Sequence, residues 1–189
     1  MHVQIRPGRS LGSFQVGRNL LYVFLLAYHP KLPSLSRDEH LERFKELARH
    51  FDGSVPSLIQ GQNDPASVVF VPVQEVETPE YYRNRTLLIG DAAHAFPPLL
   101  AQGAAMAIED AAALSGLLKD SADVEQVLRS YEGRRRPRVE TIRAAVRHRG
   151  IVRGLEGPIT PERLNQHPPI FSNSLKVYDD LIEDSFAYA

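Results

Sequence analysis

The sequence contains no cysteine and no tryptophan, has almost no net charge and lacks a long apolar run. Without cysteine, disulfide bonds, thiolate catalysis and cysteine-ligated metals are excluded. The formal charge of -1 provides no global attraction to nucleic acid or acidic lipid. The longest apolar run, residues 20–28, has about half the length that a membrane-spanning helix needs. The N-terminus also lacks the apolar segment of a secretory signal, so we expect a cytoplasmic protein without a transmembrane segment.

Two further classes of site lack their sequence signatures. The seven histidines show neither H-x-x-x-H nor H-E-x-x-H spacing, so we expect no metal site. The sequence also has no G-x-S-x-G motif, which leaves a serine hydrolase without its nucleophile. No catalytic residue is assigned on this basis.

The pattern of apolar residues predicts a mixed α/β (α+β) fold. Residues 2–28 are rich in β-branched and aromatic residues, and a turn signal at residues 17–19 predicts an antiparallel hairpin. Helical spacing of apolar residues predicts a helix over residues 36–51. Residues 67–77 return to strand character, and residues 86–90 are typical of a short strand buried on both faces. From Gln102 the chain is predicted to be helical almost to its end, with a break or kink at Pro137.

Residues 85–114 read RTLLIGDAAHAFPPLLAQGAAMAIEDAAAL and combine features of a binding site. The predicted strand ends at Gly90-Asp91. An ionised Asp91 accepts hydrogen bonds only, which suits a hydroxyl-bearing ligand such as a ribose or a ribityl chain. Taken alone, however, this pattern is more often a strand-end turn with a solvated aspartate.

The start of the following helix strengthens the first interpretation. Its opening turn, after Gln102-Gly103, presents unpaired N–H groups and the positive end of the helix dipole. A planar, partly negative group can be held there by backbone alone, and the N1–C2 carbonyl edge of a reduced flavin is such a group. An alanine-rich helix packed in a core accounts for the alanines, but not for Asp91, Pro98 and Gly103 together.

The segment GDAAHAFPPLLAQGAAMAIEDA closely resembles the second flavin-binding motif of the FAD-dependent aromatic hydroxylases, monooxygenases similar to salicylate hydroxylase and para-hydroxybenzoate hydroxylase. RNRTLLIGDAAH and YEGRRRPRVETI resemble the segments that flank it. The resemblance implies that residues 1–80 form part of an antiparallel substrate-domain sheet with one helix. Residues 81–120 would carry the flavin motif of the FAD-binding domain, and residues 121–189 its C-terminal helices and a tail. The implied enzyme uses FAD, NAD(P)H and O2 to hydroxylate or epoxidise a small aromatic or polycyclic substrate.

The resemblance also implies the residues that bind the cofactor. They are Gly90, Asp91, Pro98, Gly103, Ala104 and Ala105. Asp91 would bind ribityl or pyrophosphate-proximal hydroxyls, and the N–H groups of Gly103 and Ala104 would face the N1–C2 carbonyl edge. Pro98 would lie near the reactive side of the ring. His94 is expected to form a structural hydrogen bond rather than to act as a base.

Some features of the family are missing. Many relatives have glycine where Ala101 stands, and the para-hydroxybenzoate group has asparagine near Ala105. The N-terminal Rossmann βαβ unit with G-x-G-x-x-G, which holds the adenosine half of FAD, is absent. We therefore expect a C-terminal portion of such an enzyme that holds FAD weakly alone. The alternatives are a truncated non-catalytic remnant and half of a split enzyme. An exposed apolar edge at residues 86–90 predicts a complementing N-terminal chain or self-association.

Arginines are dense over residues 129–153. Such a helix either binds an anion or nucleic acid or presents a solvated face with some pairing to Glu132 and Glu140. The near-neutral chain and the scarcity of aromatic residues in this region favour the second interpretation, so no nucleic-acid partner is expected.

Overall fold

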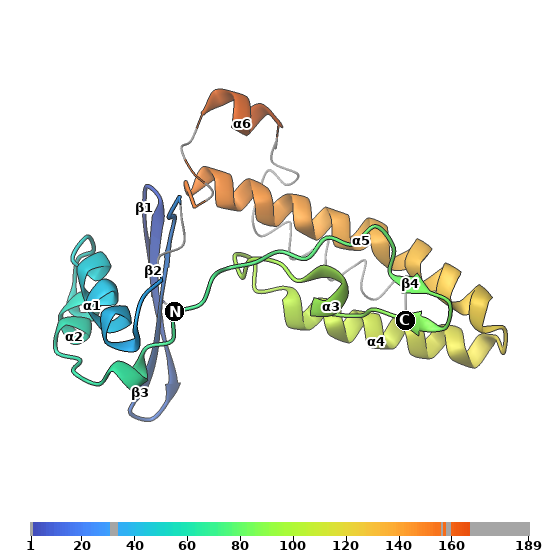
Figure 1. Ribbon diagram of the computed structural model, residues 1–189, viewed down its shortest axis with the longest axis horizontal. Coiled ribbons are helices and arrows are strands. Elements are labelled where there is room, and N and C mark those ends of the chain that lie inside the picture. The colour runs from blue at the N-terminus through green and yellow to red at the C-terminus, as the bar shows by residue number, and fades with distance from the viewer. Residues whose placement is uncertain (1, 31–33, 156, 158–159, 167–189) are drawn as a thin grey trace. The chain divides into compact units, whose positions relative to one another are not determined.

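The computed structural model describes residues 2–30, 34–155, 157 and 160–166. These residues form two compact units, one built on residues 2–72 and 150–164 and the other on residues 73–149 (Figure 1). Each unit has its own apolar core. The fold is mixed, as predicted, and no βαβ unit occurs within the described ranges.

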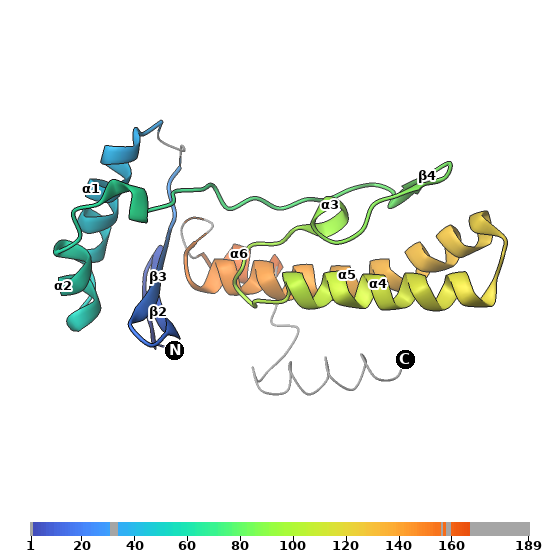
Figure 2. The same ribbon diagram turned by 90° about the horizontal axis from the view of Figure 1, so that it is seen from below.

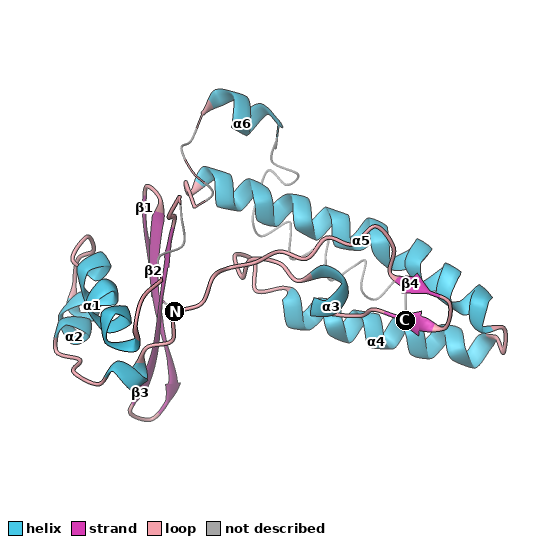
Figure 3. Cartoon of the chain, in the orientation of Figure 1, coloured by secondary structure: helices cyan, strands magenta, loops and turns pink. Residues whose placement is uncertain are grey.

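The first unit contains a three-stranded antiparallel sheet, drawn in magenta in Figure 3. Its strands, in spatial order, are β1 (His2–Arg6), β2 (Arg9–Gly17) and β3 (Leu20–Ala27). The turn between β2 and β3 falls where the sequence predicts it. The predicted hairpin is therefore confirmed, and β1 adds a third strand to it.

Helices pack against this sheet through a small apolar core. The helices are α1 (Arg37–Ala48) and α2 (Ser54–Gln60), followed by a 3-10 turn, η1 (Pro65–Ser67). Leu11 of β2 packs with Ala48, Phe51 and Ile59. The predicted helix over residues 36–51 is present as α1, and Ser36 begins it with a capping box. The last described element is α6 (Pro161–Gln166).

The second unit is dominated by two long helices, α4 (Gly103–Asp120) and α5 (Val124–Val152), which lie side by side in Figures 1 and 2. Before them come β4 (Tyr82–Arg83), β5 (Thr86–Leu87) and the one-turn helix α3 (Asp91–His94). The buried core residues that these elements share are Tyr81, Ala93, Met106, Tyr131, Val139, Ile142 and Val146. This core places α3 and the start of α4 against α5.

Two strand predictions are wrong, and the break that Pro137 could cause is absent. The strand expected at residues 67–77 is not formed: Ser67 ends η1, and no strand of the described residues pairs with residues 68–77. The strand expected at residues 86–90 shrinks to Thr86–Leu87. Pro137 lies inside α5 without ending it, since Tyr131 before it and Ile142 after it are held in the same core. The final segment expected after residue 166 lies outside the described residues.

Candidate functional site

The chain turns sharply at Gly90, the residue before α3. Gly90 has φ 56°, a left-handed conformation that favours glycine. A β-carbon at this position would lie 3.3 Å from Ala107 Cβ, so the turn packs closely on α4. The Gly90 carbonyl accepts the His94 N–H at 2.9 Å. Asp91 follows as the first residue of α3, with an exposed side chain.

Asp91 lies beside the start of α4. A β-carbon placed on Gly103 would be 3.9 Å from Asp91 Oδ1. The N-cap residue, Gln102, makes no side-chain capping bond, and the first turn of α4 contains no acidic residue. The structure therefore brings together the carboxylate and the helix start that the sequence motif pairs.

A hollow of about 580 Å³ opens at this point. The residues that line it are Asp91, Phe96, Pro97, Pro98, Ala101, Gln102, Gly103, Ala104, Ala107 and Val146. Four of the six predicted cofactor residues are among them. The other two are placed differently: Gly90 is buried behind Ala107, and Ala105 is exposed on α4 outside the lining.

The loop before α4 contains a second left-handed residue. Ala101 has φ 54°, which costs an alanine about 1–2 kcal/mol relative to right-handed backbone. Glycine adopts this conformation at no steric cost. This loop forms one rim of the hollow.

A buried carboxylate lies beneath the site. Asp110 Oδ2 accepts the backbone N–H of Gly90 at 2.7 Å and is 2.7 Å from His94 Nε2. Arg135 Nε donates to Asp110 Oδ1, also at 2.7 Å. Burial acts to raise the pKa of Asp110, but the hydrogen bonds from His94, Gly90 and Arg135 outweigh it and lower the pKa to about 2. His94 is buried and makes the expected kind of hydrogen bond, and its structural role stays a prediction.

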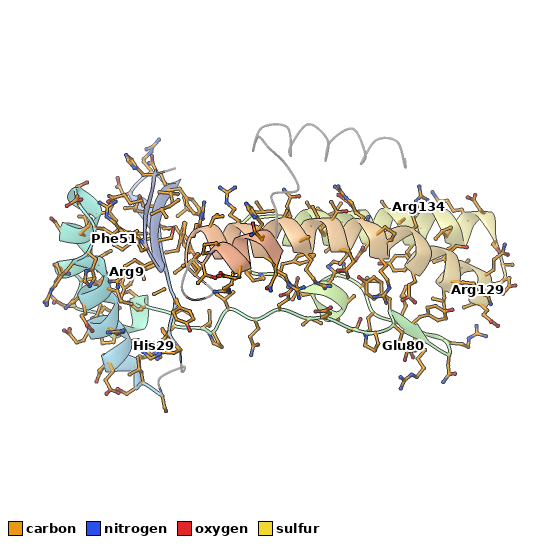
Figure 4. All side chains as sticks on the ribbon, turned by 90° about the horizontal axis from the view of Figure 1, so that it is seen from above. Arg9, His29, Phe51, Glu80, Arg129 and Arg134 are labelled. Atoms are coloured by element: carbon orange, nitrogen blue, oxygen red, sulfur yellow. The ribbon has the colours of Figure 1, made fainter. Side chains whose placement is uncertain are left out.

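The arginine-rich helix α5 is not simply a solvated face. Arg135 and Arg143 are buried, whereas Arg129 and Arg134 are exposed on α5 (Figure 4). Arg135 also bonds Glu109 at 2.8 Å. The prediction of a solvated face is wrong for the two buried arginines, because their charges are paired inside the second unit.

Buried Arg143 holds an extended segment against α5. Its Nε bonds Glu75 at 2.9 Å and its Nη2 donates to the Val76 carbonyl at 2.8 Å. The predicted pairing with Glu140 is also present, at 2.8 Å. Arg136 pairs with Glu132, as expected. The bonds to residues 75–76 span nearly seventy positions, and the sequence has no signal for them.

Two further observations concern metal ions and membranes. In the part of the chain that the structure describes, no group of three or more histidine or acidic side chains is arranged to hold a metal ion. None of the described helices combines the length and apolar character that crossing a bilayer requires.

Comparison with known proteins identifies the family. A family model described as "FAD binding domain" matches residues 21–146, more than half of the chain. The chain is 36% identical to the Bacillus subtilis protein YetM, whose name assigns it to the FAD-dependent monooxygenases, over 68% of this chain and 35% of that protein. It is 29% identical to the FAD-dependent urate hydroxylase of Klebsiella oxytoca over 77% of this chain and 38% of that enzyme.

The fold is shared with the Klebsiella pneumoniae protein HpxO. The structure of HpxO complexed with FAD and uric acid matches with a TM-score of 0.68 at 20% identity, over 97% of this chain and 43% of that one. An HpxO variant complexed with FAD matches with a TM-score of 0.73 at 22% identity, over 98% of this chain and 49% of that one. The chain thus spans 35% to 49% of the length of these relatives. With more than half of its residues matched by the family model, the chain belongs to the FAD-binding-domain family, and the two relatives named above are FAD-dependent monooxygenases by their names.

Proposed function

We propose that this chain forms the ribityl and isoalloxazine side of the FAD site in a monooxygenase that uses NAD(P)H and O2. The proposed reaction hydroxylates or epoxidises a small aromatic or polycyclic substrate. The observation that carries the proposal is the adjacency of Asp91 and Gly103 on one hollow. Bound FAD would supply the redox chemistry that activates O2. The protein would bind and orient FAD and the substrate and shield them from water.

The residues around the hollow fit a flavin. The exposed Asp91 carboxylate accepts hydrogen bonds only, so ribityl hydroxyls are suitable donors. The N–H groups of Gly103, Ala104 and Ala105 lie in the first helical turn, where no intrahelical acceptor is available. They would donate to the C2 carbonyl edge of the ring, which the helix dipole also attracts. The small side chains allow the ring to come close.

Apart from Gln102, the remaining side chains of the lining are apolar and would shield the reaction. Phe96, Pro98 and Val146 all face the hollow, and Pro98 would lie near the reactive side of the ring. Asp91 is the one titratable group among the lining residues. The lining is therefore suited to positioning an aromatic substrate and excluding water rather than to proton transfer.

We further propose that residues outside this sequence hold the adenosine half of FAD, in a longer chain or in a complementing one. The support is the lack of G-x-G-x-x-G. Exposed apolar side chains of the second unit, such as Val73 and Ile89, also suit burial against further protein. A cytoplasmic location, where NAD(P)H is available, is part of the same proposal. The rival is a remnant that retains the fold without binding FAD.

Titration of the purified chain with FAD tests the proposal. Flavin absorbance and fluorescence report binding, and Asp91→Ala is compared with Asp52→Ala, which removes another exposed carboxylate. We expect Asp91→Ala to weaken FAD affinity about tenfold, the value of one lost charge-assisted hydrogen bond, with an unchanged melting temperature. Asp52→Ala should match the wild type.

Equal affinity of the Asp91→Ala and wild-type chains would remove Asp91 from the site. If the wild-type chain binds no FAD, co-expression with an N-terminal half that carries G-x-G-x-x-G decides between a split enzyme and a remnant. Flavin retained by the pair supports the proposed function, and a flavin-free pair contradicts it.

A further inference from the structure

We propose that Asp110 is a positioning residue of the flavin motif, holding the Gly90-Asp91 turn in register with the start of α4. The inference rests on the proposed function, because the residues that it positions are the proposed flavin contacts. Asp110 does not line the hollow and is fully buried. It would therefore act through the turn and not by touching the cofactor.

Three residues on one face of α4 set the alignment of the Gly90-Asp91 turn with this helix. Gly103, Ala107 and Asp110 are spaced i, i+4 and i+7 and so share a face. Asp91 lies beside Gly103, Gly90 packs on Ala107, and the Gly90 N–H bonds Asp110 at 2.7 Å. These contacts extend along about 10 Å of helix. A shift of α4 by one turn would lose all three together.

Asp110 also holds both ends of α3. One oxygen, Oδ2, accepts the N–H of Gly90 before the helix and bonds the His94 ring at its end. A helix of one turn is not stable by itself, because nucleation is costly and few hydrogen bonds repay it. The direction of Asp91, the first residue of α3, therefore depends on this carboxylate.

The carboxylate is itself held from α5. Arg135 Nε donates to Oδ1, so donors reach Asp110 from the turn, from α3 and from α5. Charge-assisted bonds of this kind are short and directional. The network thus joins the proposed ribityl contact, the α4 start and the core of the second unit in one fixed arrangement.

Two variants of Asp110 distinguish the effect of the position of its carboxylate from the effect of its charge. Asp110→Asn removes the charge, and Asp110→Glu keeps the charge for Arg135 but displaces the carboxylate by one methylene group. Glu109→Gln is the matched control. Glu109 neighbours Asp110 on α4 and bonds the same Arg135 at 2.8 Å. It also accepts hydrogen bonds from Arg138 of α5, at 3.2 and 3.0 Å.

Hydrogen exchange of the Gly90 amide reports the turn directly, and FAD titration reports the site. In both Asp110 variants we expect Gly90 exchange to accelerate, and FAD affinity to fall, by about tenfold or more. Core amides such as those of Tyr131 and Ile142 report global stability and should lose less protection. Glu109→Gln should stay within about twofold of the wild type in both readouts at the turn.

Unchanged Gly90 protection in either folded variant, or an equal loss of FAD affinity in Glu109→Gln, would overturn the inference. If Asp110→Asn does not fold, Asp110→Glu and the wild type still decide. A scalar coupling across the hydrogen bond between Gly90 N and Asp110 Cγ is expected in the wild type, and its absence would contradict the contact. If neither the wild type nor its pair with an N-terminal half binds FAD, the proposed function fails, while Gly90 exchange still tests the hold on the turn.

Discussion

Arg135 and Asp110 form an ion pair inside the second unit, with Nε 2.7 Å from Oδ1 and side chains only 7% and 0% exposed. Arg135 makes a further pair with Glu109. A buried charge is tolerated when it is paired and hydrogen-bonded, and becomes costly once its partner is removed. This cluster is where the two long helices, α4 and α5, are joined by charge.

Replacing Arg135 should therefore destabilise the fold strongly. Arg135→Met leaves the buried Asp110 carboxylate without its α5 partner, and we expect the free energy of unfolding to fall by about 3–5 kcal/mol. Urea denaturation measures the change. Arg129→Met removes an exposed pair with Glu125 and should alter stability by less than about 1 kcal/mol. If the two substitutions had equal effects, burial of the Arg135 pair would make no contribution to the free energy of unfolding.

Acid should weaken the fold through the same cluster. The pKa of Asp110 is about 2 in the folded chain against an ordinary value of 3.8, so the folded state favours the ionised carboxylate. This stabilisation is complete above about pH 5, and it is lost as the pH falls through about 4 to 2. Its size is about 2 kcal/mol. The pKa of Glu109 is also lowered, because bonds to Arg138 and Arg135 outweigh its burial, and it acts in the same direction.

Urea unfolding at a series of pH values between about 5 and 2 tests this linkage. Asp52→Asn, which changes an exposed carboxylate, should show the wild-type pH dependence. Asp110→Asn should be less stable at neutral pH and lose less stability on acidification. A wild-type slope in Asp110→Asn would contradict the assignment of the linkage to Asp110.

Local signals in the sequence predicted the elements that depend on neighbours in sequence. The turn at residues 17–19, the capping box at Ser36 and the helix start at Gly103 are all set within a few residues, and all are found. The two main residues of the candidate site, Asp91 and Gly103, are also close in sequence, twelve positions apart. Their juxtaposition was expected from the family motif, because neither residue type alone distinguishes a site from a turn.

The features that the sequence did not predict depend on distant contacts. Residues 67–77 have strand composition, yet a strand needs a partner to pair with. Pro137 has an intrinsic tendency to break a helix, which the core around α5 overrides. The pairing of Arg135 with Asp110 crosses 25 positions. The acidic Glu109-Asp110 pair in an alanine-rich helix was the available signal, but it does not specify a partner.

Gly12 of β2 is the subject of a testable prediction about packing. Gly12 lies opposite Phe24 of β3, and a β-carbon there would be 2.1 Å from Phe24 Cζ. We expect Gly12→Ala to lower the free energy of unfolding by about 1–3 kcal/mol, because the ring must move. Adding Phe24→Leu should recover part of the loss, which a double-mutant cycle measures. An additive result would mean that the ring does not occupy the space over Gly12.

A prediction about FAD binding concerns Gly103, the first residue of α4. A β-carbon on Gly103 meets Asp91 Oδ1 at 3.9 Å, an ordinary contact, so the backbone should accept a side chain without strain. Gly103→Val would extend into the hollow and keep a ring from the helix start. We expect FAD affinity to fall about tenfold or more, with the free energy of unfolding within about 1 kcal/mol of the wild type.

Gly116→Val is the control for this substitution, because it lies on the same helix, has no atom within 4 Å of its added β-carbon and does not line the hollow. FAD titration and urea denaturation of the two variants separate a blocked site from a weakened helix. If Gly103→Val binds FAD as tightly as Gly116→Val, the cofactor does not approach the first turn of α4. In that case the carboxylate of Asp91, and not the helix start, would be the contact that this hollow offers.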